Sequence, residues 1–133
     1  MKLEGGNVLG VGVDLTEVAR IRSAHEKHGA SFLDKIFTPA EQRLCLAKAD
    51  PYPSLAARFA AKEAVAKVLG DTQGLEWHHC EVVTDSIGKP SLQITGTVAE
   101  VARARGIASW HLSLSHDGGH AIAFVVAEGS SHA

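Results

Sequence analysis

The segment 58–70, "RFAAKEAVAKVLG", constrains the fold most strongly, because it predicts a helix with apolar residues on almost every side. A helix of this kind is expected inside the protein, with other elements packed around it. Yet it carries four charged residues, and at ~100° per residue Glu63 falls within ~40° of Phe59, with Lys67 beside it. Either these charges satisfy one another in a core, or the helix lines a functional site.

The spacing of the four charges leaves both interpretations open. Glu63 and Lys67 are four residues apart with the acid on the N-terminal side, which favours a helical ion pair. In that structural interpretation, Arg58 and Lys62 reach out to solvent. In the functional interpretation, Glu63 is a carboxylate held among apolar residues to bind a hard cation, with lysines nearby for phosphate.

A second carboxylate lies in "GVGVD", which is predicted to be a strand that ends at Asp14 where the chain turns into a helix. Asp14 is a natural N-cap for that helix. However, Mg²⁺ in phosphate chemistry takes one or two protein carboxylates and completes its shell with water and phosphate. Asp14 and Glu63 supply such a pair if the helix packs over the sheet.

The remaining periodicities predict one α+β domain with mostly antiparallel strands in the order β-α-α-α-β-β-α-β-β. Gly10 and Gly12 in the first strand allow close backbone approach. The predicted segments are a strand over 7–14, a helix over 15–29, a helix from Thr38, a helix capped by Ser54 and ended by Gly70, two strands within 80–94, a helix over 97–106 and two strands within 109–128 joined at Asp117–His120. Thr38, Pro39 and Glu41 form the signature of a capping box.

Composition excludes several classes of protein. The formal net charge of −2 over 133 residues gives no overall attraction for nucleic acid or membranes, so a charged partner must be recognised by a local patch. Cys45 and Cys80 belong to no CxxC motif, which argues against a disulfide framework and for the cytoplasm. We expect a single domain over 1–133, with flexible ends at 1–7 and 128–133.

The segment "HLSLSHDGGH" places His111, Ser113 and Ser115 on one face of a strand. His116 and Asp117 then lie where the strand meets the hairpin turn. A lone histidine there is either a hydrogen-bonded structural residue or part of a site. Zinc sites built from His111, His116 and His120, or from the "HHC" at 78–80, lack a recognised ligand spacing.

Four stretches together, "GVGVDLTEVARI", "FTPAE", "RFAAKEAVAKVLG" and "SLSH", resemble the holo-acyl-carrier-protein synthases, the short bacterial type of 4′-phosphopantetheinyl transferase. The resemblance runs from Val8 to about Val126, in the order of the family, and "GKP" at 88–90 adds to it. It implies the family's α+β fold, a small mostly antiparallel sheet packed with helices, assembled as a homotrimer with active sites at subunit interfaces.

The resemblance implies that the chain transfers 4′-phosphopantetheine from coenzyme A to a serine of an apo acyl carrier protein in fatty acid biosynthesis, releasing adenosine 3′,5′-bisphosphate. Asp14 and Glu63 would bind Mg²⁺. Phosphoryl transfer needs cationic groups around the phosphates, and for these we expect Lys62 and Lys67 as point charges and Arg58 as a fork for the 3′-phosphate. His116 is expected as a coenzyme contact aided by Asp117, and the general base stays open among His116, Glu63 and a metal-bound water.

For carrier docking we expect a basic patch of Arg20, Arg22 and Lys27, with Arg20 at the position that the family uses, far from the metal site. One departure is "GDTQG", where relatives often have a Gly-Thr-Gly turn; it puts Asp71 near the expected phosphates. Two rival functions are a different Mg²⁺-dependent nucleotide enzyme, which no Walker loop or dinucleotide fingerprint supports, and a non-catalytic carrier-binding module, which would not need Asp14, Glu63 and Lys67.

Overall fold

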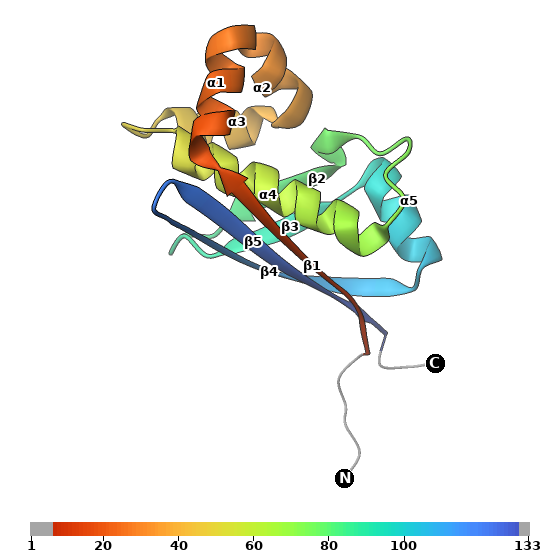
Figure 1. The fold of residues 1–133 in the computed structure, drawn as a ribbon. Helices are drawn as coiled ribbons and strands as arrows, with labels where there is room; N and C mark the ends of the chain where they lie inside the picture. The colour runs from red at the N-terminus through yellow and green to blue at the C-terminus, as the bar shows by residue number, and fades with distance from the viewer. Residues whose placement is uncertain (1–6, 131–133) are drawn as a thin grey trace.

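A computed structural model describes residues 7–130, which form the predicted α+β fold with antiparallel strands. A three-stranded sheet has the order β1-β5-β4, and a separate two-stranded sheet pairs β2 with β3 (Figure 1). The elements are β1 (Val8–Glu17), α1 (Val18–His28), α2 (Ala30–Ile36), α3 (Pro39–Leu46), α4 (Tyr52–Leu69), the 3₁₀ turn η1 (Trp77–His79), β2 (Cys80–Thr84), β3 (Pro90–Ile94), α5 (Gly96–Ala104), β4 (Ile107–Asp117) and β5 (His120–Gly129).

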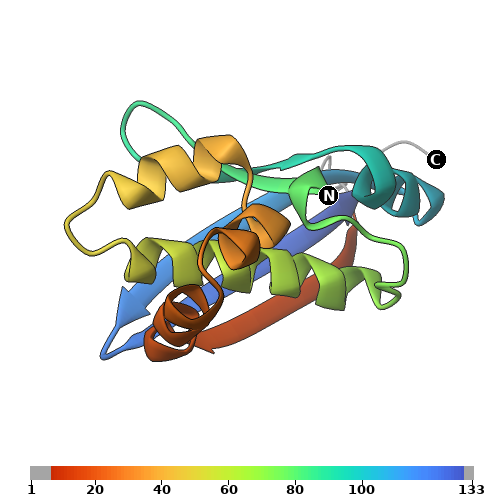
Figure 2. The same cartoon turned by 90° about the horizontal axis from the view of Figure 1, so that it is seen from above.

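Helix α4 is the centre of the molecule, as its apolar surface predicts. It lies across β1 and β5 and is flanked by the other helices and the small sheet (Figure 2). Two-thirds of its 18 residues are buried. Gly12 of β1 is needed for this packing, since a Cβ there would lie 2.1 Å from the carbonyl oxygen of Ala64. The glycines of the first strand therefore bring α4 into direct backbone contact with the sheet.

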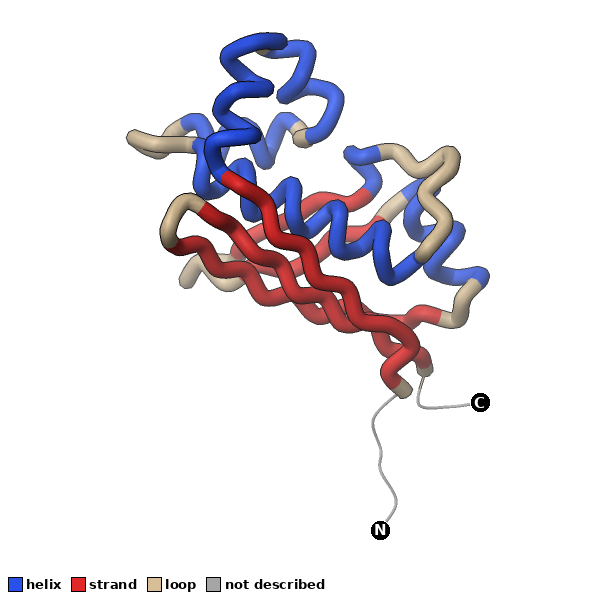
Figure 3. The backbone as a smooth tube through the Cα atoms, viewed as in Figure 1, coloured by secondary structure: helices blue, strands red, loops and turns tan. Residues whose placement is uncertain are grey.

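The two faces of the three-stranded sheet differ in cover. The face under α4 carries small buried residues, among them Ala121 and Ala123 of β5. Among residues 7–130, helices lie on this side of the sheet, and no helix covers the opposite face (Figure 3). That outer face is nonetheless apolar, with exposed side chains from β1 and β5: Val11, Val13, Leu15, Ile122 and Phe124. A contiguous apolar face of this kind is typical of an interaction surface.

The boundary between β1 and α1 differs from the prediction. Asp14 does not end the strand, because β1 continues to Glu17 by pairing Leu15 with Ile122 and Thr16 with Ala121. Helix α1 starts at Val18 without a side-chain cap, so Asp14 is not an N-cap. Leu15 therefore belongs to the outer sheet face rather than to the apolar stripe of the helix.

The capping signals before the other helices had mixed outcomes. The capping box at Thr38 is present in both directions, with Glu41 as the reciprocal partner. The cap at Ser54 is wrong, because α4 begins earlier, at Tyr52 after Pro51, and Ser54 accepts a hydrogen bond from Lys48 instead. The short helix α2 was not predicted; it follows Gly29, whose φ of 62° turns the chain sharply after α1.

Both predicted hairpins are present. Strands β2 and β3 join through a turn in which Asp85 accepts hydrogen bonds from the backbone of Ile87 and Lys89, and β4 and β5 join at Gly118–Gly119. Residues 1–6 and 131–133, where flexible ends were expected, lie outside the described residues. Glu128 and Gly129, also expected to be flexible, instead belong to β5, and the Gly129 amide donates to the Asn7 carbonyl.

Candidate active site at the edge of the sheet

Asp14 lies on β1, the edge strand of the sheet, on the face that α4 covers. One carboxylate oxygen accepts a hydrogen bond from the Thr16 hydroxyl at 2.7 Å. The other accepts one from Lys67 Nζ at 3.0 Å, and the same ammonium donates to the Val13 carbonyl at 2.8 Å. The structural ion pair of Lys67 is therefore made with Asp14, across the helix–sheet boundary, and the expected Glu63–Lys67 pair is not formed.

Glu63 is the second carboxylate at this edge. Burial raises the pKa of Glu63 above its ordinary value, the negative charge of Asp14 raises it further, and Arg20 and Lys67 lower it. Within residues 7–130, no hydrogen bond or ion pair joins Glu63 to a neighbour. A partly desolvated carboxylate beside a second acid, without a direct partner, is a site that favours a bound cation or proton.

A cavity of about 410 Å³ adjoins these groups. Helix α4 lines it with Lys62, Glu63 and Lys67, and the segment after α4 lines it with Glu76 and Trp77. Apolar side chains, among them Leu75 and Val98, contribute the rest of the lining. The cavity is large enough for a ligand of small-molecule size, with a charged end at Glu63 and Lys67.

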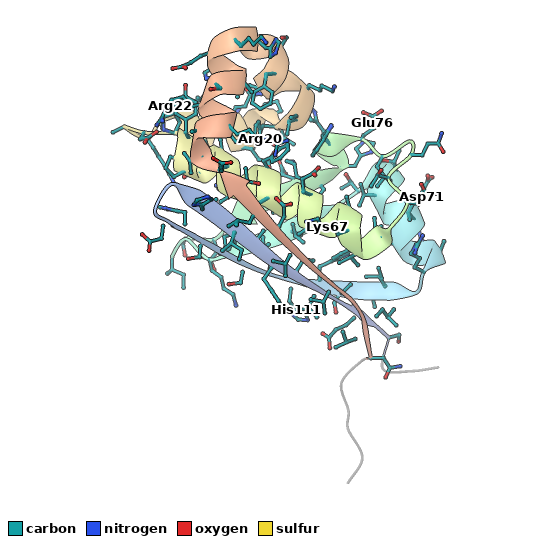
Figure 4. All side chains as sticks on the ribbon, in the orientation of Figure 1. Arg20, Arg22, Lys67, Asp71, Glu76 and His111 are labelled. Atoms are coloured by element: carbon teal, nitrogen blue, oxygen red, sulfur yellow. The ribbon has the colours of Figure 1, made fainter. Side chains whose placement is uncertain are left out.

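Arg20 lies beside this site, which corrects the expectation that it is far away. Its guanidinium lies over the Phe59 ring, 5.4 Å from the centroid, and its charge lowers the pKa of Glu63. Figure 4 shows Arg20 where α1 meets α4. Arg22 points elsewhere: its guanidinium stacks on Tyr52 at 4.9 Å and contacts the Asp50 carboxylate at 3.4 Å.

Lys62 is neither solvent-exposed nor available at the surface. Its side chain is 1% exposed, and its ammonium bonds to Glu41 Oε1 at 2.9 Å, the Cys80 carbonyl at 2.5 Å and the Trp77 carbonyl at 3.2 Å. All three donors of the ammonium are thus in use. The structural interpretation, with Lys62 in solvent, is wrong. Lys62 is among the residues that line the cavity, but it would have to leave a buried ion pair to reach a phosphate there.

Arg58 is also buried rather than solvent-exposed. It makes one long hydrogen bond to the Ser54 carbonyl, at 3.4 Å, and its Nε has no partner among the described residues. Its charge lowers the pKa of Cys45 on α3, although burial of that thiol, the larger effect, raises it overall. Arg58 is therefore not part of the group formed by Asp14, Glu63 and Lys67, and its contact with a 3′-phosphate stays a prediction.

His116 and Asp117 lie at the other side of the sheet. In the register of the strands, Thr16 of β1 pairs with Ala121 of β5, which pairs with His116 of β4. Two strand spacings, about 10 Å, thus separate the backbone of His116 from β1. One chain does not bring His116 to the Asp14–Glu63 edge.

The remaining histidines of the two zinc hypotheses have separate partners. His111 pairs with Glu128 on the outer sheet face (Figure 4), and His79 bonds to Thr97. His78 bonds to the Asp34 carbonyl, and Cys80 is buried. Across residues 7–130, no three His, Cys, Asp or Glu side chains group closely enough to hold a metal ion. Any cation at the sheet edge would therefore have two protein carboxylates, a donor set that fits Mg²⁺ completed by water and phosphate.

Asp71 lies at the C-terminal end of α4, at the far end of that helix from Arg20 (Figure 4). Its carboxylate accepts a hydrogen bond from the backbone amide of Gln73 and so closes a local turn. Gly70 and Gly74 on either side have φ values of 80° and 83°, which glycine adopts without strain. Asp71, which lies where relatives often have a Gly-Thr-Gly turn, is therefore held by a hydrogen bond within its own turn.

A family model for the 4′-phosphopantetheinyl transferase superfamily matches residues 10–125. The holo-[acyl-carrier-protein] synthase of Frankia alni is 55% identical over 121 residues, which cover 91% of this chain and 98% of that protein. The chain therefore belongs to the holo-[acyl-carrier-protein] synthase family of this superfamily, and it is an enzyme of that class.

Solved structures agree with this assignment. The synthase of Neisseria meningitidis superposes with a TM-score of 0.82 at 32% identity, covering 91% of this chain and 98% of its own. The synthase of Helicobacter pylori, solved in complex with coenzyme A, superposes with a TM-score of 0.78 at 30% identity, covering 89% of this chain and 99% of its own. The resemblance based on four sequence stretches is thus confirmed at the level of the family.

Proposed function

We propose that this enzyme transfers 4′-phosphopantetheine from coenzyme A to a serine of an apo acyl carrier protein in fatty acid biosynthesis. The serine hydroxyl loses its proton to a general base, for which His116, Glu63 and a metal-bound water are the candidates. Its oxygen forms a bond to the β-phosphorus, and the bond from that phosphorus to the bridging oxygen breaks, releasing adenosine 3′,5′-bisphosphate. The observation that carries the proposal is the Asp14–Glu63 carboxylate pair beside a cavity with Lys67 on its wall. Relatives of known name and a coenzyme A complex of one of them support it.

Asp14 and Glu63 would hold Mg²⁺. The fit rests on Glu63, whose raised pKa reflects burial and the nearby Asp14 charge, so that a divalent cation relieves both. When bound, Mg²⁺ supplies positive charge to the non-bridging phosphate oxygens, where negative charge gathers during transfer. Lys67 holds Asp14 in place and is exposed enough to reach a phosphate oxygen as well.

His116 and Asp117 fit the same site if it is shared between copies of the chain. They lie about two strands away from Asp14 within one chain, so a second copy is needed to bring such a pair to the metal edge. The bare apolar sheet face supports self-association, and we propose the homotrimer of the family. Activity should then fall on dilution below the dissociation concentration; a fully active monomer in sedimentation experiments would contradict a shared site.

Lys62 is left out of the set of phosphate ligands, since its ammonium is bound to Glu41 and two carbonyls. Arg20 remains the proposed contact for an acidic carrier protein, now next to the metal edge rather than far from it. Arg22 and Lys27 continue the basic surface along α1, although Arg22 already contacts Asp50. A carrier docked on this surface would deliver its serine near Glu63.

We also propose that the enzyme works in the cytoplasm. Cys45 and Cys80 are both free and buried, as expected for a protein from a reducing compartment. Among the described residues, no helix combines the length and the apolar character needed to cross a bilayer.

The test is to incubate the protein with coenzyme A, Mg²⁺ and an apo acyl carrier protein, and to follow the carrier by mass spectrometry. The proposal requires a carrier with one added phosphopantetheine and an equal amount of adenosine 3′,5′-bisphosphate. A carrier that binds without being modified would indicate a docking module. Release of a different nucleotide product without carrier modification would indicate another nucleotide-processing activity.

A further inference from the structure

We propose that Lys62 and Glu41 form a positioning pair. The pair fixes the position of Glu63 relative to Trp77 on the cavity wall and to the β1 edge. The inference rests on the proposed function, because the site that it positions is the transfer site. It assigns Lys62 an indirect role in place of a contact with phosphate.

The pair joins three elements through saturated hydrogen bonds. Glu41 Oε1 accepts from the Thr38 amide at 2.9 Å and from Lys62, and Oε2 accepts from the Val82 amide at 2.8 Å. The carboxylate is fully buried. It thereby ties the first turn of α3 to β2 and to the middle of α4. A buried charge with all its hydrogen-bonding positions filled fixes the relative positions of its partners more strictly than an apolar contact does.

Lys62 extends this connection to the cavity. Its ammonium holds the carbonyls of Trp77 and Cys80, the residues at the two ends of the short η1–β2 junction. Trp77 lines the same cavity as Glu63 and stacks on Phe59 with the ring centroids 5.5 Å apart. Lys62 therefore anchors the part of the cavity lining formed by Trp77 to α4, at the residue directly before Glu63.

The direction of the two neighbouring side chains makes the coupling direct. Successive residues of a helix point about 100° apart, so an inward Lys62 fixes the rotation at which Glu63 meets the β1 edge. If Lys62 lost its anchor, a small rotation or shift of α4 would move Glu63 relative to Asp14. A displacement of about 1 Å in a catalytic arrangement costs roughly 10²-fold in rate.

The experiment compares Lys62→Met, Glu41→Gln and the double variant Glu41→Met/Lys62→Met in the transfer assay, with rates normalised to folded protein. Each single variant leaves a buried charge or polar group unpaired and is at risk of unfolding, whereas the double variant removes both charges and is expected to fold. We expect kcat/KM for coenzyme A to fall by about 10²-fold in each, and the double variant to show about the same loss rather than the product of two. The Mg²⁺ concentration for half-maximal activity should rise in parallel.

Val125→Ala is the matched control, since it shortens a buried β5 side chain in the core cluster that contains neither Phe59 nor Trp77. It should lower stability and leave the rate per folded molecule unchanged. In a Trp110→Phe background, Trp77 is the remaining tryptophan, and its emission should shift in the double variant and not in the control.

Three results would overturn the inference. If the double variant folds and transfers at the wild-type rate, the pair is structural only. If Lys62→Met is impaired while folded Glu41→Gln is normal, Lys62 acts on the phosphate itself. If the two losses multiply in the double variant, the residues act separately. Failure of the wild-type enzyme to modify any carrier would instead contradict the proposed function.

Discussion

Helix α4 carries two lysines that pair with carboxylates in opposite surroundings. The Lys62–Glu41 pair is fully buried, whereas in the Lys67–Asp14 pair the lysine is 54% exposed. The buried pair connects elements of the fold, and the exposed pair lies at the cavity and at the candidate metal edge. Lys62 and Lys67, five positions apart on one helix, thus have different roles: Lys62 supports the fold, and Lys67 lies at the candidate site.

The largest effect is expected at the exposed edge, where the carboxylates are needed for chemistry rather than for folding. Asp14→Asn or Glu63→Gln removes a ligand charge and little volume. Each should lower the transfer rate by at least about 10²-fold while the protein stays folded. A transfer assay with circular dichroism as the folding control measures both, and chelation followed by added Mg²⁺ should silence and restore the wild type. Near-normal activity in either variant would make that carboxylate structural.

The two lysines themselves sharpen the contrast. Lys62→Met leaves Glu41 buried without its counter-ion and should lower the free energy of unfolding by about 3–5 kcal/mol. Lys67→Met removes an exposed ion pair and should change the free energy of unfolding by no more than about 1 kcal/mol, while reducing the transfer rate. Urea unfolding of both variants gives the comparison directly. Equal losses of stability would erase the distinction between the pairs.

A smaller effect concerns pH. Because burial and Asp14 raise the pKa of Glu63 in the folded protein, its contribution to stability is full below the ordinary pKa of 4.5. That contribution is lost as the pH rises through the folded pKa. Glu63→Gln lacks this titration, so its stability should gain on the wild type as pH rises, in the absence of divalent cations. The measurement is the melting temperature of both proteins in the presence of chelator, from below pH 4.5 upward. The expectation is wrong if the melting temperatures of the wild type and of Glu63→Gln change with pH in the same way.

The smallest effect is expected at Arg20, at the rim of the site. Arg20→Glu should raise the KM for the carrier protein by about five-fold and flatten its salt dependence, since exposed charges contribute of order 1 kcal/mol. Its position beside Glu63 adds a second expectation, a further rise in the pKa of Glu63. Arg105→Glu, at an exposed position after α5 and outside the proposed docking surface, is the matched control. Unchanged carrier kinetics in the Arg20 variant would return Arg20 to a packing role over Phe59.

Local sequence signals predicted some secondary-structure elements and missed others. Local signals were sufficient for the capping box at Thr38, the two hairpins and the buried helix. They failed at Leu15 to Glu17, where pairing with β5 extends β1 through a segment with helical spacing. No local signal competes with a tertiary partner of that kind.

The burial of Lys62 was not predicted from the sequence. Its partner Glu41 is 21 positions away, too far for a helical spacing to indicate the pair. The four-residue spacing of Glu63 and Lys67 predicted an ion pair that is not formed, since Lys67 pairs with Asp14. One signal was nonetheless present: Lys62 lies seven residues from both Leu55 and Leu69, on a stripe of the helix that is fully buried. A charge on such a stripe requires a buried counter-ion.

Mn²⁺ titration followed by electron paramagnetic resonance measures whether Asp14 and Glu63 form one cation site. The wild type should bind one Mn²⁺ per chain, more tightly at about pH 8 than at about pH 5, because protons compete for Glu63. Asp14→Asn and Glu63→Gln should each lose this binding, whereas Lys67→Met should retain it. Equal Mn²⁺ binding by the wild type and by both carboxylate variants would mean that Asp14 and Glu63 do not form a cation site.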